Sequence, residues 1–194
     1  HYYSLSASFT EPWLGGHQAQ SLTGSVYHNL YSNGFYYSKD DANYYSLKIT
    51  GAGVSFSKRL KWPDDYFIVS HGISFKHYTL DNYSLNTDIF TDGVANDLSY
   101  GFTLSRNSLD SPIYARSGSE VTVSAYVTPP YSIISGKTEF ATKQEKYKWV
   151  EYYKVNLRGS WMVNLVGDVV LNTRFRFGFM SYYNDKIGLA PFGR

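Results

Sequence analysis

Side chains that could bind a metal ion or drive hydrolysis are few and scattered in this sequence. His71 and His77 share the parity of one alternating segment, but a metal site needs a third ligand and supporting contacts, and no His-x-His or His-Asp cluster occurs. No arrangement of Ser, His and acid suggests hydrolysis. Aspartates gather instead in the expected long loops, where they serve turns: Asp40, Asp41, Asp81, Asp88, Asp92 and Asp97. The sequence therefore predicts no enzyme, no catalytic residue, no metal site and no cofactor.

Four basic residues near the end of the sequence share a pattern, because each alternates with apolar neighbours: Lys154, Arg158, Arg174 and Arg176. A charged side chain that faces lipid is costly, so we expect all four to face a water-filled lumen. Two interpretations stay open. The four could form a path for anions or lipopolysaccharide phosphates, or they could belong to a plain water-filled wall whose acidic partners lie elsewhere. The second interpretation is favoured because it requires no ligand.

Composition narrows the class of protein. The chain has 194 residues and a formal net charge of +2, so its bulk electrostatics indicate no nucleic-acid partner. It has 20 Tyr and 12 Phe but a mean hydropathy of -0.35, which fits a soluble β-sandwich or a transmembrane barrel with a polar interior. The lack of cysteine excludes disulfides and thiolate metal sites, and no apolar run is long enough for a transmembrane helix. The chain begins at His1 already in strand phase, so we expect it to be part of something larger.

Alternation of apolar and polar residues covers nearly the whole chain and predicts strands in place of helices. In the clearest segment, Leu98 and Tyr100 face one way while Ser99 faces the other. Most segments have about the nine to eleven residues that a tilted strand needs to cross a bilayer. A change of phase at Gly51–Gly53 predicts a bulge or kink. Eight strands are expected: Tyr3–Phe9, Leu22–Leu30, Tyr45–Phe56, Phe67–Tyr78, Leu98–Leu104, Val121–Val127, Tyr153–Trp161 and Val169–Phe179.

Short and long connections alternate between these segments. The short ones lie near Glu11–Ala19, Arg59–Asp65, Asp110–Ser119 and Asn164–Asp168. The long ones lie near Ser32–Asn43, Thr79–Asn96 and Pro129–Tyr147. Every short turn therefore falls on one edge of the sheet and every long loop on the other, which is typical of bacterial outer-membrane barrels.

Aromatic residues sort to the same two edges. Amphipathic rings gather at both interfaces of a membrane, whereas a soluble sandwich gives no reason for two belts. We therefore predict an all-β fold, an antiparallel transmembrane β-barrel of which eight strands are present. The short-turn edge has Trp13, Trp62 and Trp161, and the long-loop edge has Trp149, Tyr36, Tyr37, Tyr44 and Tyr45.

One short turn carries a more specific pattern. The stretch DSPIYARSG resembles the periplasmic turn of the BamA-type outer-membrane assembly family, and it matches that turn at Asp110, Tyr114 and Gly118. Ala115 departs from it, because the family usually has Pro at this place. We expect the Asp110 carboxylate to cap turn amides and Gly118 to supply a backbone conformation that other residues resist.

Three further stretches follow in the order of that family. LSASFTEPWLGG is similar to an upstream strand and turn, with Glu11, Pro12 and Trp13 in place of Asn-Pro-Tyr. YYKVNLRGSWMVNL is similar to a later strand. APFGR, at Ala190–Arg194, resembles the Pro-Phe that introduces the large sixth extracellular loop. The resemblance therefore runs along the whole chain.

The resemblance implies both an architecture and a function. Residues 1–194 would form a single partial barrel domain, the middle eight of sixteen strands, with POTRA domains and the remaining strands outside the chain. Such a barrel folds and inserts other β-barrel proteins into the bacterial outer membrane, with neither a cofactor nor enzymatic turnover. Its partners would be unfolded client proteins, lipoproteins of the assembly complex, and outer-membrane lipids and lipopolysaccharide. The long loops would be extracellular and the short turns periplasmic.

Two other interpretations remain open from the residues alone. A self-contained eight-stranded barrel could act as a structural anchor or a small pore, since eight strands suffice to close a barrel filled by side chains. It predicts that the strand beginning at Tyr2 pairs with the strand ending near Tyr183. A soluble carbohydrate-binding β-sandwich would instead use loop tyrosines to stack on sugars.

Overall fold

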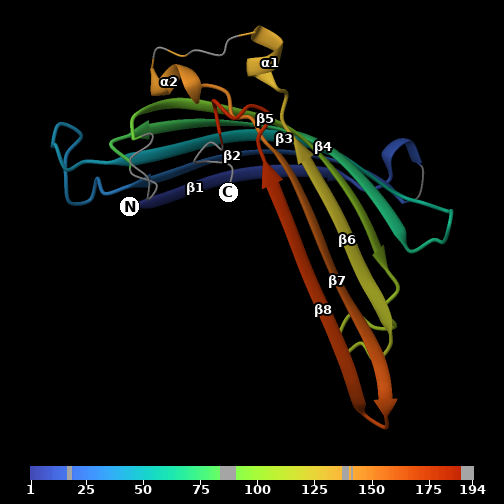
Figure 1. Ribbon diagram of the computed structural model, residues 1–194. Coiled ribbons are helices and arrows are strands. Elements are labelled where there is room, and N and C mark those ends of the chain that lie inside the picture. Colours follow the sequence, from blue (N-terminus) through green and yellow to red (C-terminus); the bar gives the residue numbers. More distant parts are fainter. Residues whose placement is uncertain (17–18, 84–90, 137–139, 141, 189–194) are drawn as a thin grey trace.

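Eight strands form one antiparallel sheet in chain order, each paired with its neighbours in sequence (Figure 1). The computed structural model describes residues 1–16, 19–83, 91–136, 140 and 142–188. The strands are β1 (Tyr2–Glu11), β2 (Gln20–Ser32), β3 (Ser46–Arg59), β4 (Phe67–Asp81), β5 (Gly93–Asn107), β6 (Gly118–Val127), β7 (Tyr153–Val166) and β8 (Val169–Ser181). The helices are η1 (Leu14–Gly16), α1 (Tyr131–Ser135) and α2 (Lys143–Lys146). Within the described ranges, no helix combines the length and apolar character needed to span a bilayer.

All eight predicted strands are present, and the predicted all-β fold is confirmed. The strands are longer than expected, from 10 residues in β1 and β6 to 15 residues in β4 and β5. They lengthen because pairing continues past the alternating stretches toward the loops. Short connections and long loops alternate as predicted, with long loops at 33–45, 82–92 and 128–152.

The sheet is open among the described residues, because β1 and β8 are each paired along a single edge. Figure 1 shows β6, β7 and β8 running at a steep angle to β1–β5, as strand twist accumulates across the sheet. The self-contained barrel required the strand at Tyr2 to pair with the strand ending near Tyr183, and that prediction is wrong. The sandwich is wrong as well, since the described strands form one sheet.

The pairing register sorts side chains onto two faces. We call the face that bears Phe175 and Phe177 on β8 the outer face, and the register carries it across every strand to Leu5 on β1. Exposed large apolar side chains gather there, as a membrane-facing wall requires. They include Leu5, Phe9, Val26, Val54, Ile73, Tyr100, Val155, Leu171, Phe175, Phe177 and Phe179. The opposite, inner face is mostly polar.

The bulge predicted at Gly51–Gly53 is wrong. The pairing of β3 with β2 and β4 runs through both glycines without interruption. The apolar residues change face because the inner face is covered at its long-loop end, where Leu47, Tyr78 and Leu80 pack in a buried cluster. The rest of that cluster comes from β5 and the loop before β7: Ala95, Tyr147, Val150 and Tyr152.

Asp97 was predicted to lie in a long loop but instead lies inside β5 on the inner face, only 2% exposed. It lies 3.9 Å from the Lys76 ammonium and accepts a hydrogen bond from the Tyr152 hydroxyl at 3.3 Å. β5 starts before the predicted Leu98, in a part that β6 does not reach. The loop before β7 pairs with that edge instead: the Asn96 amide donates to Lys148 O and the Val150 amide donates to Asn96 O, both at 2.8 Å. Asp88 lies outside the described residues.

Candidate functional site

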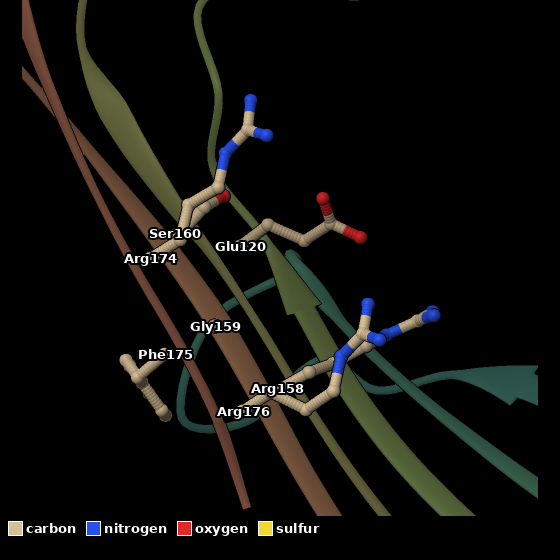
Figure 2. A pocket seen from close by; sticks show the side chains of 7 residues that line it. All are labelled: Glu120, Arg158, Gly159, Ser160, Arg174, Phe175 and Arg176. Carbon is tan, nitrogen blue, oxygen red and sulfur yellow. The ribbon is translucent and has the colours of Figure 1, made fainter.

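The predicted basic residues lie on the inner face of β7 and β8. Arg158 is directly opposite Arg176, and Ser160 is opposite Arg174. Glu120 on β6 is opposite Ser160 from the other side. Figure 2 shows these charged side chains projecting to one side of the sheet, while Phe175 projects to the other.

Three of the four basic residues, Arg158, Arg174 and Arg176, line one hollow of about 380 Å³. Glu120 lines the same hollow. Lys154 lies four residues from Arg158 along β7, where it pairs with Tyr126 on β6 and Met180 on β8. At about 3.3 Å per residue, this places it about 13 Å from Arg158 along the strand. The structure therefore groups three of the predicted residues and separates the fourth.

The hollow has an excess of positive charge. Like charges directly opposite each other destabilise a strand pair, and Arg158 faces Arg176 in this way. Among the described residues, the ion pairs lie elsewhere and none joins these arginines to a carboxylate. Arg174 has a neutral partner, since Asn172 accepts hydrogen bonds from it at 2.8 and 3.0 Å once its amide oxygen faces the guanidinium. The lumenal role of the four residues stays a prediction.

A second inner surface, which the sequence reasoning missed, covers β2–β6 and consists of short hydroxyls and glycines. Hydroxyls pair across strands at 2.8 Å between Ser57 and Ser70 and between Ser74 and Ser99. Thr103 donates to the Ser124 hydroxyl at 3.1 Å. The signal was visible as small residues at every second position of these strands. These hydroxyls carry no charge and bond one another across the strands.

The turn between β5 and β6 is organised by Asp110, as predicted. Its carboxylate accepts hydrogen bonds from the Arg116 amide at 3.0 Å and from the Ser117 hydroxyl at 3.1 Å. Hydrogen bonds from Ser117, first through its backbone, and from the Arg116 amide lower the pKa of the Asp110 carboxyl below its ordinary value. Tyr114 has a φ of 56° and is 93% exposed at the tip.

Gly118 closes this turn in a conformation that only glycine adopts readily. Its φ is +101°, and a Cβ at this position would lie 2.1 Å from the Ser108 carbonyl oxygen. Ion pairs tie the turn to its neighbours. Arg116 contacts Asp168 in the β7–β8 turn at 2.7 Å, and Arg106 contacts Asp64 in the β3–β4 turn at 3.0 Å. The short-turn end is therefore held together across several connections.

The predicted interface aromatics lie at both ends of the strands, with one exception. Trp13, next to Pro12 in the β1–β2 turn, is exposed at the short-turn end, as are Trp62 and Trp161. Trp149 packs on Tyr131 and Phe75 at the other end, where Tyr36, Tyr37 and Tyr45 are exposed in or beside the 33–45 loop. Tyr44 is only 7% exposed, because the loop folds over its ring, so its assignment to an interface is wrong.

Comparison with known proteins identifies the family. A profile described as the Omp85 superfamily domain matches residues 1–193. The chain belongs to the Omp85 superfamily. No curated protein matches this Omp85 chain.

A solved structure shows the same fold. The Omp85 chain superimposes on the crystal structure of BamA from Haemophilus ducreyi lacking POTRA domains 1–3, with a TM-score of 0.68 and 18% sequence identity. The match covers 98% of the Omp85 chain and 35% of the BamA chain, so the Omp85 chain spans about a third of the length of that BamA structure. The likeness confirms a BamA-type barrel fold. The predicted loop motif at Ala190–Arg194 lies outside the described residues.

Proposed function

We propose that this protein is an outer-membrane protein assembly factor, which helps other β-barrel proteins to fold and insert without enzymatic turnover. The observation that carries the proposal is the Omp85 superfamily match along residues 1–193. The BamA-type fold supports it. Terminal strands of such a barrel, outside this chain, could offer an edge that pairs with an incoming strand through main-chain hydrogen bonds.

The open edges of β1 and β8 support a larger barrel. A sheet edge in hydrocarbon leaves backbone N–H and C=O groups unsatisfied, and each such group costs several kcal/mol. Both terminal strands of the described sheet have one such edge. We therefore infer that strands outside the chain pair with β1 and β8, in a barrel of about sixteen strands with POTRA domains attached.

The topology supports one orientation in the membrane. Outer-membrane barrels have short periplasmic turns and longer extracellular loops. The 33–45, 82–92 and 128–152 loops would then be extracellular, and the Asp110–Gly118 turn would be periplasmic. Clients would be unfolded barrel proteins, with lipoproteins of an assembly complex and outer-membrane lipids as the other partners.

The basic hollow fits a wall better than a transport path. Its three arginines lie beside the hydroxyl wall of β2–β6, and Lys154, the next basic residue of β7 toward the long loops, lies outside the hollow, so the basic side chains form no continuous path. We infer that Arg158 and Arg176 find acidic partners on parts of the barrel outside this chain.

Reconstitution of the full-length protein tests the proposal. Liposomes that contain it should accelerate the folding of a urea-denatured barrel client, read out by heat-modifiable electrophoretic migration and by protease protection. Matched liposomes with an unrelated closed barrel at the same protein-to-lipid ratio control for bilayer defects. Equal folding rates in the two preparations would overturn the assembly function.

A further inference from the structure

We propose that the outer face of β1–β4 binds one phosphate-bearing lipid, with an acyl chain in an apolar groove and the phosphate held near Lys48, His28 and His77. The proposal rests on the barrel lying in a membrane and not on its action on clients. It assigns a ligand site to a surface that the assembly function does not use.

The groove exists because small residues interrupt a bulky apolar surface. Ala7 on β1, Gly24 on β2 and Ala52 on β3 lie on the outer face among larger side chains. A Cβ at Gly24 would meet no atom within 4 Å, so the space above it is open. Two apolar hollows of about 720 and 370 Å³ are adjacent and share Ala7, Val26 and Ala52 as lining residues. We call the two hollows together the groove.

The groove ends at a polar row toward the long loops. The register places His28, Thr50 and His77 side by side on β2, β3 and β4, one row beyond Val26 and Ala52. The smaller hollow reaches all three of these polar residues. Polar side chains are rare on a lipid-facing wall, and those that occur there mark functional contacts.

Two lysines on β3 define the depth of this row. Lys48 and Lys58 both lie on the outer face, ten residues apart. At about 3.3 Å per residue and a tilt of about 40°, their separation along the membrane normal is about 25 Å, the height of the apolar band of such barrels. Lys48 is therefore at headgroup level at the long-loop end, and the histidine row lies just inside it.

Two members of this polar surface, Lys48 and His28, can donate hydrogen bonds to an anion. Nδ1 of His28 bonds Thr50 Oγ1 at 2.8 Å and Nδ1 of His77 bonds Asn96 Oδ1 at 2.7 Å, which fixes both rings. Within the described part of the chain, Nε2 of neither ring has a hydrogen bond. The Thr50 hydroxyl can donate to Nδ1 of His28, which leaves Nε2–H of that ring as a donor. Nδ1–H of His77 donates to the Asn96 amide oxygen, so that ring borders the site without donating to it. Lys48 forms no ion pair among the described residues, not even with Asp81, which is one row closer to the loop.

A phosphate with attached acyl chains matches both halves of this site. An uncharged lipid would leave Lys48 and the His28 ring without an anionic partner, and free phosphate would leave the groove unused. A lipid of the long-loop leaflet places its phosphate at headgroup level and its chain along the groove toward Gly24 and Phe9. Charge and shape together select this occupant.

Native mass spectrometry of the full-length protein tests the site with dioleoyl phosphatidic acid, with dioleoylglycerol, which has the same chains and no phosphate, and with inorganic phosphate alone. One phosphatidic acid should be retained at activation energies that strip the other two. Equal retention of dioleoylglycerol, or retention of phosphate alone, would overturn the proposal.

Matched variants locate the site. Gly24→Leu should weaken retention by about tenfold, because the new side chain displaces lipid methylenes from the groove. Thr173→Leu, on the outer face of β8, is its control and should have no effect. Lys48→Ala should weaken retention by about tenfold, whereas Lys58→Ala, at the other end of the same strand, should not.

Folding of each variant is checked by heat-modifiable migration. If Gly24→Leu does not fold, Ala52→Leu fills the same groove from the next strand and decides the question. Equal retention by the filled variant and the wild type, or equal losses in Lys48→Ala and Lys58→Ala, would overturn the site. Loss of client folding with lipid retention intact would count against the assembly function only.

Discussion

The outer faces of β1–β4 and of β7–β8 follow the same alternation but present different surfaces. A Cβ at Gly24 would meet no atom within 4 Å, whereas a Cβ at Gly159 would lie 2.4 Å from the Phe175 ring. The first surface is hollowed, and the second is filled by aromatic rings. Alternation decides which face a residue occupies, but side-chain volume decides what that face can hold.

The inner faces of the two regions differ in charge. On β2–β6, short hydroxyls bond each other across strands, as Ser74 and Ser99 do. On β7 and β8, Arg158 is opposite Arg176, and no carboxylate within the described residues forms an ion pair with either. The hydroxyls of the first wall bond one another, whereas the paired arginines of the second have no carboxylate partner among the described residues.

The turns of the two regions should differ most in their tolerance of a side chain. Gly118→Ala in the β5–β6 turn should lower the free energy of unfolding by about 3 kcal/mol, since its Cβ would collide with a backbone carbonyl at a positive φ. Gly167 in the β7–β8 turn has a φ of +55°, and a Cβ there would meet no atom within 4 Å. Gly167→Ala should therefore lower the free energy of unfolding by only about 1 kcal/mol. Urea unfolding of the full-length protein in micelles measures both, and equal losses would contradict the contrast.

The stability of the two outer faces should respond differently to added side-chain volume. Gly159→Val should destabilise by about 2 kcal/mol, because the Phe175 ring must leave its place. Gly24→Val should change stability by less than about 0.5 kcal/mol, since its space is open and valine suits a strand. The same unfolding assay compares them. A loss of similar size in both variants would show that the groove is not open.

The charge contrast of the inner faces can be sharpened at Arg176. Arg176→Glu turns a repulsive cross-strand pair with Arg158 into an attractive one and should stabilise the isolated strand pair by up to about 1 kcal/mol. If acidic groups outside the chain already neutralise both arginines, the substitution destabilises the full-length protein instead. The sign of the shift in the urea midpoint, with Arg174→Glu opposite Ser160 as control, decides between these outcomes.

The Asp110 turn should contribute a modest pH dependence to the free energy of unfolding. The folded-state pKa of this carboxyl is lowered, so its stabilising effect is present above the unfolded value of about 3.9 and is lost as the pH falls through the folded value. Asp110→Asn should therefore shift the unfolding midpoint at pH 7, and the shift should shrink as the pH falls below about 3.9. A shift of the same size above and below that pH would contradict a role for the charge.

Much of the fold follows from local sequence, but three assignments failed for one shared reason. The phase change at Gly51–Gly53, the position of Asp97 and the burial of Tyr44 all depend on loops that cover the long-loop end of the sheet. Residues such as Val150, distant in sequence, bury the inner face there. Alternation within one strand contains no information about such a cover.

The turn at Asp110–Gly118 was predictable in more detail. Its hydrogen bonds and its positive φ involve residues within about one turn of each other, so their types and spacing predict the geometry. The groove on β1–β4 was not predictable, because Gly24 borders Phe9 and Val54 only through strand pairing.

By itself, the sequence determined the strands, the alternation of short and long connections, the two faces and the family, because periodicity and turn residues act over a few positions. Only the tertiary structure decided which residues meet across strands. It placed Arg158 opposite Arg176, left the space above Gly24 open and filled the space at Gly159. These properties arise from register, which joins residues far apart in the chain and sets the volume and charge that each face presents.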